Sequence, residues 1–218
     1  MSDDLELQQR VMDELDFEPS INAAHIGVSV RDGVVTLSGH VASFVEKFAA
    51  ERAARRVKGI KAVAQELDVH LPTDRKTGDD EIAARAINIL NWDTVVPRER
   101  VTIKVEHGIV TLGGEVDWNY QRTEAEYDMR KLTGVKAVIN NILVKPNVRT
   151  EDVRAKIRAA LERTAEVEAN NVTVTVSGST VTLAGKVNAW TEREAVERAA
   201  WSAPGVTQVV DRIELARP

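Results

Sequence analysis

The chain contains no cysteine, which excludes disulfide staples, thiol catalysis and thiolate metal sites. No apolar run approaches the roughly 20 residues that a membrane-spanning helix needs. The N-terminal stretch MSDDLELQQRVMDEL is acidic and lacks the basic and apolar regions of a signal peptide. These absences predict a soluble, cytoplasmic protein.

The chain also lacks an excess of positive charge, because its net charge is −5. A nucleic-acid-binding protein normally carries a basic excess, so no nucleic-acid partner is expected. One basic cluster does occur, and because Glu51 lies beside it we interpret it as a solvated helix end; it contains Arg52, Arg55, Arg56, Lys58 and Lys61.

One short stretch is present three times, as GVVTLSGHV at 33–41, GIVTLGGEV at 108–116 and STVTLAGKV at 179–187. Its glycines lack the Gly-Lys-Ser/Thr ending of a phosphate loop and the G-x-G-x-x-G turn of a dinucleotide fold. Apolar residues alternate with polar ones, which is typical of a half-buried strand. The repetition therefore indicates a tandem array.

The remaining elements recur in the same register around the anchor glycines Gly39, Gly114 and Gly185. A helix and a strand precede each anchor strand, and a second helix and a last strand follow it. Each copy thus predicts an αββαβ unit, an α+β sandwich whose three-stranded mixed sheet carries two helices on one face. The expected domains are 1–72, 73–146 and 147–218, joined through the turn-rich segments LPTDRKTGDD and KPNVRTED.

Several local details follow from the pattern. The anchor glycines fall on the buried face of their strand, where a missing side chain lets the following helix approach closely or permits a bulge; ligand contact is the alternative. A second set of glycines is expected to end the second helices, at Gly59, Gly134 and Gly205. Ser43 and Glu46 form a capping box, and Asp117 and Asn188 are candidate N-caps. A right-handed crossover makes the second and third strands parallel, with the first expected between them.

The anchor strands, together with the glycine that ends each second helix, resemble the BON family of bacterial modules. The resemblance covers nearly the whole chain as three copies, and copy two is the closest, through ILNWD at 89–93 and VDWNYQR at 116–122. It implies a small α/β sandwich that binds phospholipid or supports the cell envelope under osmotic stress. Copy three departs from the pattern at Ser179, and copy one departs in the HVASFVEK segment.

No catalytic, cofactor or metal site is predicted. The four histidines occupy different places in the repeat and have no partner at helical spacing; they are His25, His40, His70 and His107. Acidic pairs such as Asp79-Asp80 and Glu151-Asp152 lie at helix starts, where they suit the helix dipole. The chain is therefore expected not to be an enzyme.

Aromatic side chains supply the candidate binding residues, in a chain with only 4% aromatics. At 100° per residue, one pair in each second helix points away from the buried stripe. These six residues are Phe44, Phe48, Tyr120, Tyr127, Trp190 and Trp201. Trp118 falls near the buried stripe and is expected in the core.

Two hypotheses account for these rings. In the first, they bind phospholipid or another envelope component, and the protein is peripheral to a membrane. In the second, they pack against neighbouring repeats, a protein partner or a second copy, and the protein is a scaffold or homo-oligomer without a lipid ligand. The acidity of the chain disfavours anionic lipid. Basic residues at one equivalent position of the second helices favour it, although two of them could simply snorkel beside the core; they are Lys47, Arg122 and Arg193.

Overall fold

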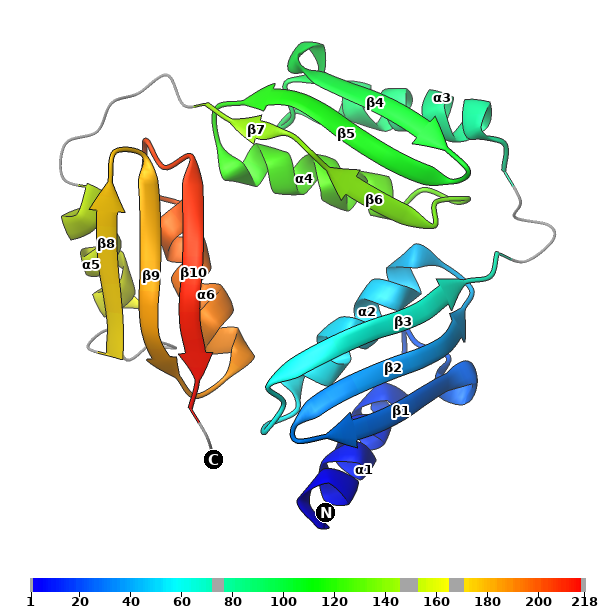
Figure 1. Cartoon of the computed structure of the whole chain (residues 1–218). Coiled ribbons are helices and arrows are strands. Elements are labelled where there is room, and N and C mark those ends of the chain that lie inside the picture. The colour runs from blue at the N-terminus through cyan, green and yellow to red at the C-terminus, as the bar shows by residue number, and fades with distance from the viewer. Residues whose placement is uncertain (1, 72–76, 146–152, 165–170, 217–218) are drawn as a thin grey trace. The chain divides into compact units, whose positions relative to one another are not determined.

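The structure is a computed structural model that describes residues 2–71, 77–145, 153–164 and 171–216 (Figure 1). The two predicted joints, apart from their ends, lie outside the described residues, as does the acidic pair Glu151-Asp152. Each repeat is described by itself. Within the described residues, no helix is long and apolar enough to cross a membrane.

The first repeat has the predicted order of helix, two strands, helix and strand. Its elements are α1 (Ser2–Phe17), the short 3-10 helix η1 (Ala23–His25), β1 (Ile26–Arg31), β2 (Val34–Val41), α2 (Phe44–Arg56) and β3 (Ala62–Val69). Both helices lie against one face of the sheet (Figure 1). They share one buried core, in which Val11 of α1 and Ala50 of α2 meet Leu37 of β2.

The second repeat follows the same order, with its last strand in two pieces. Its elements are α3 (Asp79–Trp92), η3 (Arg98–Arg100), β4 (Val101–Glu106), β5 (Ile109–Val116), α4 (Asn119–Arg130), β6 (Ala137–Asn140) and β7 (Leu143–Val144). The break falls at Asn141, where the Asn140 side chain accepts a hydrogen bond from the Ile142 N–H. Both pieces pair with β5.

The third repeat consists of α5 (Val153–Arg163), β8 (Val172–Ser177), β9 (Thr180–Val187), α6 (Trp190–Trp201) and β10 (Gln208–Leu215). Its core again joins both helices to one sheet face, through residues such as Ile157, Leu183 and Val196. The predicted fold class, three mixed three-stranded sheets each with two helices, is confirmed.

The predicted strand order is wrong, whereas the parallel pairing is correct. In the first and third repeats the anchor strand is central: β2 pairs antiparallel with β1 and parallel with β3, and β9 pairs in the same way with β8 and β10. The tight hairpin turn makes the first two strands neighbours, and the crossover helix then places the third strand on the free edge of the anchor strand.

The anchor glycines are required for a different reason from the close helix approach that we expected. Gly39, Gly114 and Gly185 have positive φ angles of 110°, 106° and 134°. A Cβ atom on Gly39 would lie 2.1 Å from the carbonyl oxygen of His25, at the start of the neighbouring strand. The backbone of the first strand therefore excludes a side chain here, and the positive φ favours glycine independently.

The second set of glycines also has positive φ, between 88° and 101°. Gly59, Gly134 and Gly205 do not directly follow the last helical residue but lie in the turn beyond it. They redirect the chain from the second helix into the last strand.

In two repeats, an aspartate of the first helix accepts hydrogen bonds from the hairpin turn, a contact that the sequence analysis did not predict. The turn residues His107 and Gly108 both have positive φ, and both their N–H groups donate to the carboxylate of Asp79, at 2.7 and 2.8 Å. Asp4 does the same for Asp32 and Gly33. These hydrogen bonds hold the pKa of the Asp79 carboxyl below its ordinary value, with the Gly108 N–H as the largest cause.

The start of each second helix is held by an acidic or amide side chain in its first turn. Glu46 accepts from the N–H groups of Asn22 and Ala42, and its own N–H donates to Ser43, which confirms the capping box. The equivalent residue of the second repeat is Gln121, whose amide oxygen accepts from the N–H groups of Asp117 and Trp118.

In the third repeat, Glu192 accepts from the N–H of Asn188. Asn188 itself is not the cap that we expected, because α6 starts after Ala189 and has no side-chain cap.

Candidate functional site

The most exposed of the predicted binding rings are two tyrosines of α4. Tyr120 is 57% exposed and Tyr127 is 54% exposed. The ring of Tyr120 stacks on that of Trp118, with 6.4 Å between centroids. Trp118 is half-buried, so the expected core residue reaches the surface and supports its neighbour.

The other four rings are half-buried: Phe44, Phe48, Trp190 and Trp201. Trp201 packs against the core of its own repeat, and its indole N–H donates to Glu197 of the same helix. The guanidinium of Arg193 lies 5.0 Å from the Trp190 ring centroid, within reach of a cation–π interaction. These rings are less available than the helical geometry predicts.

The equivalent basic residues of the second helices make contacts inside their own repeats. The ammonium group of Lys47 donates to the carbonyl of Leu67 in β3, 2.5 Å away. Arg193 forms an ion pair with Asp211 of β10, with 2.6 Å between nitrogen and oxygen. Lys47 and Arg193 therefore tie the second helix to the last strand rather than forming a free basic surface.

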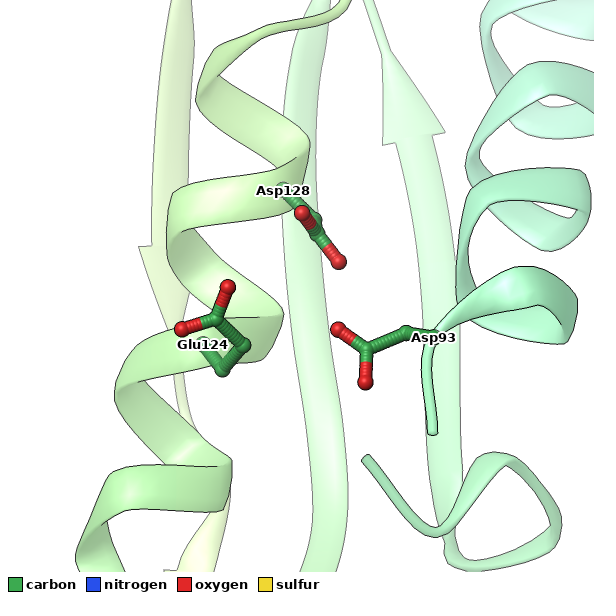
Figure 2. A group of neighbouring side chains, drawn as sticks. All are labelled: Asp93, Glu124 and Asp128. Carbon is green, nitrogen blue, oxygen red and sulfur yellow. The ribbon is translucent and has the colours of Figure 1, made fainter. Parts of the chain in front are cut away.

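Three carboxylates of the second repeat lie together, which the sequence analysis did not predict. Oxygen atoms of Asp93, Glu124 and Asp128 lie within 4.8 Å of one another, as Figure 2 shows. Asp128 is only 5% exposed, and carboxylate oxygens are the ligands that Ca²⁺ and Mg²⁺ prefer.

Two of the three carboxylates, Asp93 and Asp128, already have partners within the protein. Asp93 accepts hydrogen bonds from the N–H groups of Val95 and Val96, and Asp128 also has partners. Two features of the sequence could have revealed the group. Glu124 and Asp128 are spaced i, i+4 on one helix, and both positions are alanine in the first and third repeats.

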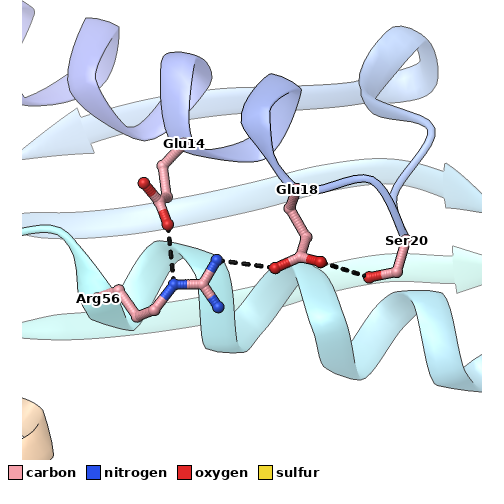
Figure 3. Close-up of polar contacts among 4 residues, drawn as sticks. All are labelled: Glu14, Glu18, Ser20 and Arg56. Atoms are coloured by element: carbon pink, nitrogen blue, oxygen red, sulfur yellow. Dashed lines mark hydrogen bonds and ion pairs between the residues drawn. The ribbon is translucent and has the colours of Figure 1, made fainter.

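In the first repeat, a charge network joins α1 and the residues that follow it to α2 (Figure 3). Arg56 of α2 donates to Glu14, 2.8 Å away, and to Glu18, 2.9 Å away. Hydrogen bonds from Ser20 and then Arg56 lower the pKa of Glu18, and the bond to Glu14 raises the pKa of Arg56. The basic cluster at the end of α2 is therefore partly a structural contact.

Three of the four histidines form a stack on the first sheet, although no common role was expected for them. The ring centroids of His25 and His40 are 4.6 Å apart, and those of His40 and His70 are 4.8 Å apart. The two-residue turn at Asp32-Gly33 places His25 opposite His40, and this register could have revealed the pair.

The repeated fold defines a class of protein: an array of three small αββαβ modules whose exposed features lie on separate modules. The BON domain family matches the chain three times, at residues 3–70, 78–146 and 149–217. The chain therefore belongs to the BON family, as the repeated glycines predicted.

Among characterised proteins, the chain is similar to Osmotically-inducible protein Y of Escherichia coli strain K12. The two are 30% identical over 147 residues, which cover 66% of this chain and 73% of the relative.

Among solved structures, the chain matches CdsD, a structural protein of the type III secretion system of Chlamydia trachomatis. The identity is 16%, the match covers 98% of this chain and 93% of that one, and the TM-score is 0.27. A second structure, of the C-terminal domain of CdsD, has 14% identity and the same TM-score. Superposition at this level supports no functional comparison.

Proposed function

We propose that this chain is a non-enzymatic BON protein of the osmotic stress response that associates with phospholipid at the cell envelope. The outer faces of the second helices make the contact, and α4 contributes most. In this proposal the protein is cytoplasmic and peripheral to the membrane. Family membership and the similarity to an osmotically inducible relative support the role.

The observation that carries the proposal is the exposure of Tyr120 and Tyr127 on one helix. Tyrosine has an apolar ring and a polar hydroxyl, so it suits the boundary between acyl chains and headgroups. Charge argues against a preference for anionic lipid, because the chain carries −5 and α4 itself bears Glu124 and Glu126. We therefore expect binding that does not depend on anionic lipid and that changes little with salt.

The test is co-sedimentation of the full chain with phosphatidylcholine vesicles, with and without phosphatidylglycerol, at low and physiological salt. The double variant Tyr120→Ala/Tyr127→Ala should bind roughly tenfold more weakly, corresponding to a loss of about 1.4 kcal/mol. The matched control is Trp92→Ala, which removes a ring that is 87% exposed at the end of α3.

Equal loss of binding in both variants would contradict a role for α4. Failure of the wild-type chain to bind either vesicle would overturn the lipid proposal and leave a protein partner or a second copy. Circular dichroism of each variant separates lost binding from lost folding.

A further inference from the structure

The stacked histidines come from positions in or next to three adjacent strands of one sheet. His25 precedes β1, His40 lies in β2, and His70 follows β3. The register Ile26↔Gly39 fixes the first pair, and the hydrogen bond from the His70 N–H to the Val41 carbonyl fixes the second. The rings are nearly parallel, with interplanar angles of 17° and 23°. Their backbone positions are therefore held by sheet hydrogen bonds.

Solvent reaches this stack, because His25 and His70 are exposed and His40 is half-buried. Asp68 is the register partner of His40 on β3 and is also exposed, so its carboxylate lies on the same face. The face thus offers three imidazoles and one carboxylate to a ligand from solution.

Imidazole nitrogen is a good ligand for Zn²⁺, Cu²⁺ and Ni²⁺. Zinc-to-nitrogen bonds of about 2.0–2.1 Å place two nitrogens on a tetrahedral ion roughly 3.3 Å apart. The ring centroids of His25 and His40 are 4.6 Å apart, so the two rings must rotate until one nitrogen of each converges at the spacing that the ion requires, a movement that exposed side chains can make about χ1 and χ2. No change in the backbone is required.

The other two repeats show that the fold does not require histidine at these positions. The equivalent residues are Arg100, Glu115 and Lys145 in the second repeat, and Asn171, Lys186 and Ala216 in the third. In the second repeat, Lys145 and Glu115 form an ion pair. Opposite charges thus stabilise this edge in one module, whereas the first module has three side chains that can all coordinate a metal.

We propose that His25, His40 and His70 form a binding site for a divalent transition-metal ion of the class that prefers imidazole. His25 and His70 stack on opposite faces of His40, and the nitrogen lone pairs of imidazole lie in the plane of the ring, so the ion lies at the solvent-facing edge of the stack, with His40 as the shared ligand. Asp68 or water completes the coordination. The site is independent of the α4 surface.

The experiment is isothermal titration calorimetry, in which the full chain without a purification tag is titrated with ZnCl₂ and separately with CuCl₂. We expect one ion per chain, and nitrogen hyperfine structure in the electron paramagnetic resonance spectrum of bound Cu²⁺. His40→Gln should weaken binding at least tenfold. Because protons compete for imidazole, acidic buffer should weaken it as well.

Two matched variants make the result decisive. The triple replacement His25→Arg/His40→Glu/His70→Lys installs the residues of the second repeat, where this edge folds, and should abolish binding. His107→Gln removes the one histidine outside the stack and should leave binding unchanged. The proposal is overturned if the wild-type chain binds no metal, if the triple variant binds as well as wild type, or if Asp128→Asn abolishes binding, which would place the ion at the acidic group instead.

Discussion

Replacing Glu46 in the first turn of α2 with alanine should destabilise the first repeat. Glu46 is 8% exposed, and its two oxygens accept hydrogen bonds from Asn22, at 2.7 Å, and Ala42, at 2.9 Å. These bonds join the start of α2 to two other segments, the chain before β1 and the end of β2. The variant leaves both N–H groups without their acceptor.

A hydrogen bond to a charged group contributes about 1.5–3 kcal/mol. Since both N–H donors are only partly buried and water can reach them, we take the lower end of that range for each. The expected loss is about 3 kcal/mol. A domain of this size shifts its melting temperature by roughly 4–8 °C per kcal/mol, so the first repeat should melt more than about 10 °C lower.

Glu46→Gln is the matched control, because Gln121 occupies the same position in the second repeat. Glutamine has one acceptor oxygen instead of two, so about half of the loss should remain. The four tryptophans all lie in the second and third repeats, at positions 92, 118, 190 and 201, and their fluorescence does not report the first repeat directly.

Hydrogen exchange of peptides from residues 2–71 measures the relevant opening. The reasoning fails if Glu46→Ala leaves exchange of these peptides unchanged, or if Glu46→Gln is as damaging as alanine.

Three further changes test other parts of the fold. Gly114→Ala should unfold the second repeat, since its Cβ would lie 2.0 Å from the Arg100 carbonyl oxygen, whereas the neighbouring Gly113→Ala meets only a side-chain oxygen and should fold; thermal melting followed by tryptophan emission compares them. The carboxyl of Asp79 has a lowered pKa, so its contribution to stability is present above its ordinary pKa and is lost as pH falls through the native pKa. In Asp79→Asn, the free energy of unfolding measured with denaturant should therefore fall less steeply with acidic pH than in the wild type. Parallel curves for the two proteins would contradict this. Arg56→Met should lose about 0.5–1 kcal/mol, less at high salt, in the same hydrogen-exchange assay.

The architecture was predictable because the same sequence pattern occurs three times in the chain. Alternation around Val35 and Leu37 identifies a half-buried strand, and the helical stripe of Leu7, Val11 and Leu15 supplies its cover; both are buried in the structure. Each local pattern agrees with its counterpart in the other copies, so a wrong assignment of secondary structure in one copy can be corrected from the other two. Family membership followed from the same glycines.

Strand order and the reason for the anchor glycines were not predictable from periodicity, because both depend on which backbone lies beside the anchor strand. Alternation assigns Gly39 to a face but says nothing of the His25 carbonyl at its edge. Helical angles likewise place Trp201 away from the buried stripe, although the ring folds back onto its own core. An indole is long enough to reach the core from a flanking position, which a projection of Cβ directions ignores.

Comparing equivalent positions separates residues that the fold needs from residues available for a function. The anchor glycine recurs in every module, and the side chain that holds the second helix is Glu46, Gln121 or Glu192, so these belong to the fold. The histidine stack occurs in the first module alone, where the other two modules have Arg100, Glu115 and Lys145, or Asn171, Lys186 and Ala216. Since each module folds without its neighbour's special residues at these places, stability does not account for them. We propose that a ligand particular to one module accounts for the histidines, and the metal titration of the first repeat tests this.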